Sequence, residues 1–439
     1  MLTDHYELTM VQAALRSGTA QRRSVFELFA RRLPSGRRYG VVAGTGRALD
    51  AIENFQFSAQ QLDYLRDQAV VNDETLAWLE GYRFTGDVWG YGEGDVYFPG
   101  SPLLVVDSTF AEAVVLETVL LSIFNHDSAV ASAASRMALA AEGRPCIEMG
   151  ARRTHEDAAV AAARAAYVVG FSATSNLQAG MEHGIPTTGT AAHAFTLVHD
   201  TERDAFVAQV ESLGHGTTLL VDTYDIREAV RTSVEVAGND LGAVRIDSGD
   251  LSQLAREVRA QLDELGATRT RIIVTSDLDE FAIAGLAAAP VDGYGVGTSL
   301  VTGSGHPTCG FVYKLVARAS SLDSGAPLTA VAKKSSDKLS IGGRKFALRR
   351  RDAEGVAEVE LIGIGQPPQH DGDDRDLLLP LVQAGDVVGR ESLASARARH
   401  RDAVAELPMA AHKLSRGEPA IPTDYVGDGR AASTNPFAS

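Results

Sequence analysis

TLLVDTYD at residues 218–225, AVRIDSGD at 243–250 and RIIVTSD at 271–277 share one pattern, in which a short apolar run stops on small polar and acidic residues. Three more runs end in the same way: YVVG before FSATSN at 167–176, IPTTGT before AAH at 185–193, and VDGYGVGTS at 291–299. Segments of helical length, rich in Ala, Leu, Glu and Arg, separate the runs. The alternation predicts strand-helix units built around a parallel sheet.

The polar ends of these runs indicate where a functional site lies. Parallel β/α proteins place their functional side chains where strands end, at one edge of a sheet or one mouth of a barrel. We therefore expect the six endings to line a single site.

Composition excludes several classes of protein. The chain has 439 residues, of which 45% are apolar and 22% charged, as is typical of a globular protein with two or three domains. Asp and Glu outnumber Lys and Arg by 57 to 41, which gives a formal net charge of −16, and no basic stripe is present. Such a surface repels phosphate backbones and anionic lipids, so we expect neither nucleic acid nor a membrane as a partner.

A cytoplasmic location is expected from three features. The N-terminus MLTDHYELTM lacks the basic and apolar regions of a secretion signal. Only Cys146 and Cys309 are present, which favours a reducing compartment. The most apolar helical stretch, AVVLETVLLSIFNHD at 113–127, is interrupted by Glu117 and is expected to be too short to span a bilayer.

The chain is expected to divide into three parts. Residues 1–112 mix a helix with antiparallel strands, and residues 113–332 carry the strand-helix series of an α/β barrel. Residues 333–439 return to strands, with the turn of a hairpin expected at Gly342-Gly343 and a flexible tail from about 427. A β-rich beginning and end that bracket a barrel-like centre is the simplest architecture.

The strand end AVRIDSGDL is the most specific of the six. Arg245 and Asp247 are two positions apart in a strand, so both point to the same side, and Asp250 follows closely. Such charges either pair with one another as scaffolding or hold a ligand. An Arg can grip a planar carboxylate or phosphate, and an Asp can accept sugar hydroxyls or stabilise a developing cation.

Two further strand ends carry candidate ligand contacts. His193 follows the Gly189-Thr190 turn, where it could contact a ligand or act as a base or nucleophile, although a lone His is more often a satisfied core or surface residue. Gly295, Gly297 and Thr298 follow the last strand, where glycines let backbone N–H groups approach a phosphate; the alternative is a tight loop that needs a positive φ.

The remaining polar candidates are less specific. The adjacent Arg152 and Arg153 suit a pyrophosphate group or a solvated helix cap. At the N-terminus, a capping pair of Asp4 and Glu7 would make Tyr6 either a core aromatic or an exposed lid residue. No set of His, Asp and Glu has metal-ligand spacing, so a metal is expected to be Mg²⁺ held through ligand phosphates. Other strand ends finish on paired polar residues, Ser276 with Asp277 and Asp222 with Asp225.

Eleven motifs occur in the order in which nicotinate phosphoribosyltransferases carry similar ones, so the chain resembles that family from Thr3 to about Ser340. The motifs are TDHYELTM, FELFARRLP, VVAGTGRAL, EMGARRTH, FSATSN, IPTTGTAAHAF, VDTYD, VRIDSGDL, SDLDE, YGVGTSLVT and GFVYKLV. The resemblance implies a type II phosphoribosyltransferase of α/β class: an incomplete parallel α/β barrel beside an α+β domain built from the N- and C-terminal segments. It also implies a homodimer with the active site near the interface.

The resemblance further implies a reaction and its participants. Nicotinate and phosphoribosyl pyrophosphate give nicotinate mononucleotide and pyrophosphate in NAD salvage, with Mg²⁺ present and ATP hydrolysis coupled through a phosphohistidine. The phosphorylated position corresponds to His193, the nicotinate contacts to Thr190 and Arg245, and the aromatic residue that covers the ring to Tyr6. The positions near phosphoribosyl pyrophosphate correspond to Arg152, Asp247, Asp277, Gly297 and Thr298. The pyridine nitrogen attacks without losing a proton, so Asp247 would steady the ribose while Mg²⁺ and Arg152 stabilise the departing anion.

Two alternatives stay open. Nicotinamide phosphoribosyltransferase looks similar at the same strand ends, but it carries an acidic residue where this chain has Ser175, and a carboxylate there would repel nicotinate. A non-catalytic sensor of the sugar phosphate is the second alternative, and the presence of His193 argues against it.

Overall fold

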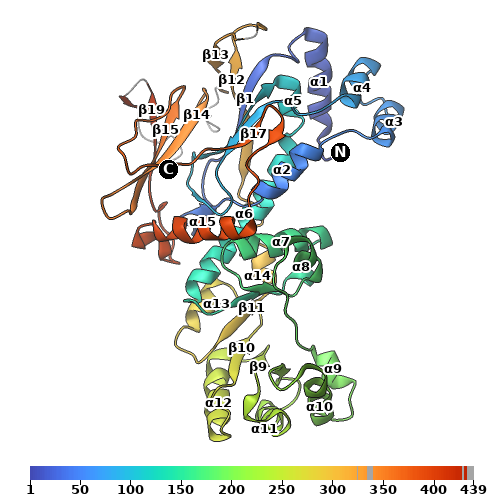
Figure 1. Cartoon of the computed structure of the whole chain (residues 1–439), viewed down its shortest axis with the longest axis vertical. Coiled ribbons are helices and arrows are strands. Elements are labelled where there is room, and N and C mark those ends of the chain that lie inside the picture. The colour runs from blue at the N-terminus through green and yellow to red at the C-terminus, as the bar shows by residue number, and fades with distance from the viewer. Residues whose placement is uncertain (324, 334–339, 428–429, 433–439) are drawn as a thin grey trace. The chain divides into compact units, whose positions relative to one another are not determined.

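The computed structural model describes residues 1–323, 325–333, 340–427 and 430–432, and the chain divides into two compact units (Figure 1). Unit 1 comprises Met1–Ser132 and Thr308–Ser439, and unit 2 comprises Ala133–Pro307. The barrel domain expected at 113–332 is longer than unit 2 at both ends. The difference arises because helix α6 (Glu117–Ala140) begins in unit 1, and because strand β12 (Phe311–Ala319) pairs with β1 (Arg23–Ala30) of unit 1.

Unit 2 is a curled half-barrel of parallel strands. The strands lie in the order β7-β6-β11-β10-β9-β8, and each neighbouring pair is parallel. Because the edge strands β7 and β8 do not pair with each other, the barrel is incomplete, as expected from the family resemblance. The strands are β6 (Cys146–Glu148), β7 (Ala173–Thr174), β8 (Thr218–Leu220), β9 (Ala243–Ile246), β10 (Arg271–Val274) and β11 (Gly293–Val296).

The helices of unit 2 alternate with these strands. Asp225 and Asp250, two of the acidic strand ends, cap the following helices by accepting hydrogen bonds from the backbone N–H groups of Glu228 and Gln253. The helices are α7 (Glu156–Val168), α8 (Leu177–His183), α9 (His193–Leu197), α10 (Glu202–Leu213), α11 (Ile226–Ala237), α12 (Leu251–Glu264), α13 (Glu280–Gly285) and α14 (Thr298–Val301), with the 3₁₀ turns η1 (Ala151–Arg153) and η2 (Gly238–Asp240).

Two of the six runs expected to be strands are not strands. Residues 167–170 end helix α7 and form the turn after it, because the Ala-rich sequence before them favours helix, and the strand of this unit is β7 instead. Residues 185–190 form only an isolated bridge between Thr187 and Thr174. The strand missing from the prediction is β6, directly before the paired arginines.

Unit 1 is an α+β domain built from both ends of the chain, as the resemblance implied. Within the described residues its sheets have the strand orders β13-β12-β1-β5-β3-β17-β18, β16-β14-β15-β19-β20 and β2-β4. The further strands are β2 (Gly40–Val41), β3 (Asp87–Gly90), β4 (Val96–Tyr97), β5 (Pro102–Thr109), β13 (Leu328–Ala330), β14 (Lys345–Arg351), β15 (Ala357–Ile364), β16 (Arg375–Asp376), β17 (Leu379–Gln383), β18 (Asp386–Val387), β19 (Thr423–Gly427) and β20 (Arg430–Ala432).

The helices of unit 1 begin at recognisable caps. Ser58 and Gln61 form a capping box at the start of α3, and Asn72 caps α4. The predicted cap of α1 is wrong: Asp4 occupies the N-cap position without a side-chain hydrogen bond, and Glu7 is buried, where it accepts hydrogen bonds from Thr3 and Thr118. The helices are α1 (His5–Ser17), α2 (Thr45–Asn54), α3 (Ala59–Asp67), α4 (Asp73–Glu80), α5 (Phe110–Val114) and α15 (Leu393–Ala405), with the 3₁₀ turn η3 (Met409–His412).

A buried charge network joins the C-terminal strands to the N-terminal half of unit 1. The fully buried guanidinium of Arg349 on β14 donates to Asp95, at 3.2 Å, to Glu406, at 2.7 Å, and to Glu360 on β15. Arg375 shares Asp95 and Glu406. Since an unpaired buried charge is costly, removing either arginine would leave acids that disfavour the fold.

Two expectations for the C-terminal part fall on residues that the structure does not describe. The hairpin through Gly342-Gly343 includes 334–339, which lie outside the described residues; its other arm, β14, forms a hairpin with β15 through 352–356. Of the tail expected to be flexible from about 427, residues 428–429 and 433–439 lie outside the described residues, and Arg430–Ala432 form β20.

One helical run among the described residues is long and apolar enough to cross a membrane. It spans Phe110–Ala140, 31 residues whose most apolar 18-residue window has a mean hydropathy of 1.3, and is longer than expected because the helix continues past Asp127 through a small-residue segment. Since 67% of its most apolar window is buried inside the protein, the run has the character of a core helix.

Candidate active site

Polar side chains from three neighbouring strand ends meet at one edge of the half-barrel. Asp222 follows β8, Asp247 follows β9 and Thr275 follows β10. Asp222 Oδ2 accepts hydrogen bonds from the backbone N–H of Asp247, at 2.9 Å, and from the hydroxyl of Ser248, at 2.7 Å. Thr275 donates its hydroxyl to Asp247 Oδ1. The carboxyl ends of three parallel strands therefore converge on one polar network, whereas the sequence predicted that six endings line a single site.

Asp247 and Arg245 face the same side of β9, as strand alternation required. Arg245 Nη2 lies 3.4 Å from Asp247 Oδ2. Its Nη1 donates to the hydroxyl of Thr190, at 3.1 Å, and to the carbonyl of Ala191, at 3.2 Å. Arg245 Nε is buried and has no hydrogen-bond partner among the described residues. The guanidinium is thus held in place while keeping donor capacity for a ligand.

His193 begins helix α9 and lies beside two carboxylates. Its Nδ1 is 3.1 Å from Thr223 Oγ1, and its Nε2 is 3.8 Å from Asp222 Oδ1 and 4.0 Å from Asp247 Oδ2. The side chain of His193 is 40% exposed, whereas that of Asp222 is 2% exposed. Asp222 Oδ1 is buried without a hydrogen-bond partner in the described structure. A reactive nitrogen therefore faces solvent next to an acceptor with an unused lone pair.

A second polar group organises the ends of β6 and β7. Glu148, at the end of β6, is buried and accepts hydrogen bonds from the hydroxyl of Thr174 and the backbone N–H of Gly150. Burial raises the pKa of this carboxyl. The contacts fix the turn that leads into Arg152 and Arg153, both of which are exposed and whose guanidinium groups make no hydrogen bond or ion pair with a described residue. Two free guanidinium groups are left at this strand end.

Two glycines at the end of β11 have different roles: Gly295 lies within the strand, contrary to the expectation that it follows it, and Gly297 comes directly after the strand. A Cβ atom on Gly295 would lie 2.5 Å from Thr275 and 2.7 Å from the sulfur of Met149, so only glycine fits there. Gly297 has no such restriction and its φ is −116°, so the alternative of a loop that needs positive φ does not explain it. Thr298 is exposed at the start of α14. Backbone N–H groups at this turn are accessible to an anion.

Tyr6 lies in unit 1 and belongs to a polar cluster there. Its side chain is exposed, which excludes the expectation that Tyr6 is a core aromatic and leaves that of an exposed residue. Burial of the hydroxyl and the nearby Glu117 carboxylate raise the pKa of Tyr6 to about 12. Glu117 also lies 3.7 Å from Lys314, which lines a cavity of about 340 Å³ together with Arg31 and Lys333. Arg31 Nε is buried without a hydrogen-bond partner among the described residues, so this cationic cavity can accept an anion.

The predicted residues fall into separate groups. His193, Thr190, Arg245 and Asp247 form one contact network. Arg152, Gly297 and Thr298 lie at neighbouring strand ends, and Asp277 is exposed after β10 without a hydrogen bond to a described residue. Its neighbour Ser276 has a φ of 143°, a strained value for a residue other than glycine.

Four residues of the network were not predicted to act: Asp222 was noted only as a strand end, and Thr223, Ser248 and Thr275 were not singled out. Their signal was present in the polar ends VDTYD, IDSGD and VTSD, but a strand end does not reveal which of its residues turns inward. No group of three or more His, Cys, Asp or Glu that could hold a metal occurs in the described part of the chain.

Comparison with known proteins gives consistent matches. A family model described as the nicotinate phosphoribosyltransferase (NAPRTase) N-terminal domain matches residues 1–125. The nicotinate phosphoribosyltransferase pncB1 of Mycobacterium tuberculosis (strain CDC 1551 / Oshkosh) is 58% identical over 435 residues, covering 97% of this chain and 95% of that protein. The nicotinate phosphoribosyltransferase of Bacillus subtilis (strain 168) is 38% identical over 325 residues, covering 72% and 66%.

Solved structures share the fold. The crystal structure of human nicotinic acid phosphoribosyltransferase superimposes with a TM-score of 0.81 at 25% identity, covering 95% of this chain and 97% of that one. The nicotinate-nucleotide pyrophosphorylase of Pyrococcus furiosus superimposes with a TM-score of 0.74 at 22% identity, covering 92% and 94%, which bears on the fold alone.

Proposed function

This chain belongs to the nicotinate phosphoribosyltransferase family, and from that membership and the geometry of its strand ends we propose that it forms nicotinate mononucleotide and pyrophosphate from nicotinate and phosphoribosyl pyrophosphate. The product would serve NAD salvage. The observation that carries the proposal is the network in which Arg245, Asp247 and His193 lie together at the carboxyl ends of the half-barrel strands.

Arg245 is proposed to bind the carboxylate of nicotinate. Its guanidinium is fixed by Thr190 and Ala191, and its Nε has no partner among the described residues. The planar guanidinium group, with N–H donors still free, matches a planar carboxylate in shape, and its hydrogen bonds to the carboxylate would be charge-assisted. This orientation would direct the pyridine nitrogen toward the sugar, while Tyr6 covers the ring.

Asp247 is proposed to stabilise the ribose as pyrophosphate leaves. The bond from the anomeric carbon to the pyrophosphate oxygen breaks, positive charge develops on the ribose ring, and the lone pair of the pyridine nitrogen forms the new bond. Asp247 keeps 28% of its side chain exposed and is oriented by Thr275, so its negative charge is fixed before the reaction begins. No base is needed, because the attacking nitrogen carries no proton to lose.

Phosphoribosyl pyrophosphate is proposed to bind at Arg152, Asp277, Gly297 and Thr298, with its phosphate groups at Arg152 and at the backbone of Gly297 and Thr298. The free guanidinium of Arg152 and the accessible backbone at Gly297 support an anion site at these strand ends. The cationic cavity of Arg31, Lys314 and Lys333 in unit 1 is a further candidate for substrate phosphates.

The residues present fit Mg²⁺, which the family resemblance implies. Asp222 and Asp247 supply oxygen donors, and Asp222 Oδ1 is buried without a hydrogen-bond partner in the described structure. These two carboxylates would hold the ion together with phosphate oxygens of a ligand, and the ion would neutralise charge on the departing pyrophosphate.

ATP coupling is proposed to proceed through phosphorylation of His193. Nδ1 is engaged by Thr223, which leaves Nε2 to attack the γ-phosphorus of ATP. The bond between nitrogen and phosphorus forms as the bond to ADP breaks, while the proton of the imidazole stays on Nδ1, which donates it to Thr223 Oγ1. The Asp222 carboxylate, at 3.8 Å from Nε2, would stabilise the positive charge that develops on the ring. A phosphorylated His193 would add charge and acceptor oxygens at the entrance to the site.

A substrate comparison tests the proposal. The protein is mixed with ATP, Mg²⁺ and phosphoribosyl pyrophosphate, together with either nicotinate or nicotinamide, and pyrophosphate release is measured. Release is expected with nicotinate, because the neutral Ser175 and the cationic Arg245 favour the acid. Equal or greater release with nicotinamide would overturn the substrate assignment, and no release with either would support the sensor alternative.

A further inference from the structure

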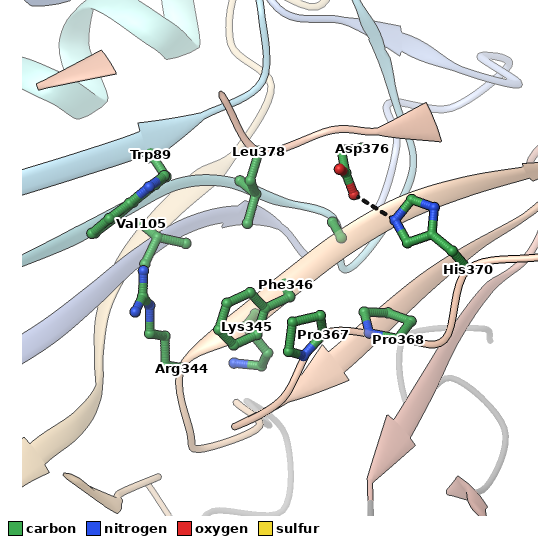
Figure 2. Close-up of a pocket in the computed structure, with 11 residues that line it drawn as sticks. Trp89, Val105, Arg344, Lys345, Phe346, Pro367, Pro368, His370, Asp376 and Leu378 are labelled. Carbon is green, nitrogen blue, oxygen red and sulfur yellow. Dashed lines mark hydrogen bonds and ion pairs between the residues drawn. The ribbon is translucent and has the colours of Figure 1, made fainter. Parts of the chain in front are cut away.

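A cavity of about 290 Å³ lies within unit 1, apart from every residue assigned to the reaction above. Its walls come from β3 and β5 of one sheet, β14 of another, and the segment before β16 and β17 (Figure 2). Figure 2 shows Trp89 and Arg344 at one end and His370 with Asp376 at the other, with Phe346 and Pro367 between them. The volume is at the small end of the range of about 300–1,000 Å³ typical of ligand pockets.

Arg344 is held in this cavity without a polar partner. Its guanidinium lies 4.2 Å from the centre of the Trp89 ring and 5.1 Å from that of Phe346. Nε is buried, and the guanidinium makes no hydrogen bond or ion pair with any described residue. Burial lowers the pKa of Arg344, because the charged form is poorly solvated. Aromatic faces stabilise the cation but satisfy none of its N–H donors.

The neighbouring charges are already paired. Lys345 points to the other face of β14, where its ammonium donates to Glu27, at 2.6 Å, and to the carbonyl of Ile341, at 2.7 Å. Asp107 is the acid that raises the pKa of Arg344 most. It forms a bidentate salt bridge with Arg23, in which both N–O distances are 2.8 Å. Arg344 is therefore left as the cation with free donors at this end of the cavity.

The opposite end offers a different recognition group. His370 Nε2 lies 2.9 Å from Asp376 Oδ1, and both side chains are exposed. The pair fixes the imidazole ring, so that Nδ1 remains available for a hydrogen bond. Between the two ends, Phe346, Pro367 and Leu378 provide an apolar lining (Figure 2).

We propose that this cavity binds a small planar aromatic acid, with its anionic group on Arg344 and a polar substituent across the ring on His370. A guanidinium matches a carboxylate in shape and charge, and the apolar wall between the polar ends suits a ring rather than a flexible chain. The residues that line this site belong to unit 1, and none of them is among the residues proposed to act in the reaction.

Trp89 provides a direct measurement of binding. The chain has only two tryptophans, Trp78 and Trp89, so the full-length Trp78→Phe variant reports Trp89 alone. Its emission is titrated with para-hydroxybenzoate as the probe. Saturable quenching is expected with this probe, weaker binding with benzoate, and none with para-hydroxybenzamide or inorganic phosphate, which lack the anion or the ring. The Trp89→Phe variant, which reports Trp78, should show no saturable change.

Substitutions at the two ends separate binding from a structural role. Arg344→Met keeps the apolar stem and should weaken para-hydroxybenzoate roughly tenfold or more, the worth of a charged hydrogen bond. Arg66→Met, the same change on the exposed face of α3, should leave the affinity unchanged. His370→Ala should abolish the advantage of para-hydroxybenzoate over benzoate. Equal affinities in Arg344→Met and the parent, or no saturable quenching at millimolar probe, would overturn the proposal.

Discussion

Among single residues, Asp222 is the most constrained group of the site. One carboxylate oxygen accepts two hydrogen bonds that fix the β9 turn, and the other is buried beside His193 without a hydrogen bond to a described residue. A carboxylate fixed in this way costs free energy in the absence of a ligand. That cost would be recovered when positive charge, on the imidazole ring during phosphorylation or on a metal ion carried by a ligand, comes next to the free oxygen.

The role of His193 leads to the first prediction. His193→Ala should abolish the stimulation of turnover by ATP while leaving ATP-independent turnover measurable, because the chemistry at the sugar does not use the imidazole. Pyrophosphate release is measured with and without ATP. His215→Ala, a histidine exposed before β8 and so at the opposite edge of the sheet, is the matched control and should retain ATP coupling. Unchanged stimulation in His193→Ala would exclude the phosphohistidine.

Arg245 leads to the second prediction. Arg245→Ala should raise the KM for nicotinate by roughly 10- to 100-fold, the worth of a charge-assisted hydrogen bond, and change that for phosphoribosyl pyrophosphate far less. Initial rates at varied concentrations of each substrate give the two constants. Arg271→Ala, an exposed arginine at the start of β10, should change neither. Similar effects on both substrates would remove Arg245 from the carboxylate role.

At the scale of helices and strands, the contact between α10 and α11 contains a pH-sensitive group. Glu202 lies in the first turn of α10, and its buried Oε1 has no hydrogen-bond partner among the described residues. Burial and the nearby Asp225, which caps α11, raise the pKa of Glu202 to about 7. Between about pH 4.5 and 7 the folded protein therefore keeps a proton that the unfolded chain has released, and stability falls as the pH rises through this window.

The third prediction follows from this group. Glu202→Gln should raise the free energy of unfolding by roughly 1 kcal/mol above pH 7, after allowance for solvent screening, and by nothing below pH 4.5. Chemical denaturation at the two pH values measures the difference. Glu211→Gln, on the exposed side of the same helix, should be neutral at both. A pH-independent effect of Glu202→Gln would contradict the assignment.

The sequence predicted the strands of unit 2 correctly where a short apolar run ends on polar residues and a segment of helical length follows. Residues 218–225, 243–250 and 271–277 form strands with polar ends because β-branched and apolar residues precede their turns. Residues 167–170 were misassigned, since a short apolar run at the end of an Ala-rich helix looks the same as a strand. Strand β6 was missed because its sequence, Cys146–Glu148, follows Arg144 and Pro145 and contains no apolar run like that of β8. The choice of Thr275 rather than Asp277 for the network depends on the turn after β10, which no periodicity specifies.

At the scale of the whole molecule, the assembly of unit 1 from both chain ends was implied by family resemblance rather than by residue patterns. The buried network around Arg349 joins β14 and β15 to Asp95, more than two hundred residues earlier in the chain. Contacts at such separation leave no local signal in the sequence. The charged residues that make them look like ordinary surface residues until the fold is known.

The proposed homodimer leads to the fourth prediction. If Tyr6 covers nicotinate bound by the other subunit, a dimer of one Tyr6→Ala and one Arg245→Ala chain has one site with both changes and one with neither. Mixing and re-pairing the two impaired variants should then restore about a quarter of wild-type activity, since half of the random dimers are mixed. Pyrophosphate release before and after mixing measures the gain. The absence of a gain, with mixed dimers verified by mass, would place Tyr6 and Arg245 in the same subunit's site.

The open side of the half-barrel has a consequence for solubility. An exposed sheet edge can recruit a strand from another molecule and so start aggregation. Here β7 has two residues, and the backbone of Thr174 already pairs with Pro186 and Thr188, while the other edge, β8, has only three residues to offer an incoming strand. The short edge β8 and the cover over β7 thus leave the incomplete barrel few free backbone groups that could act as a template for misassembly.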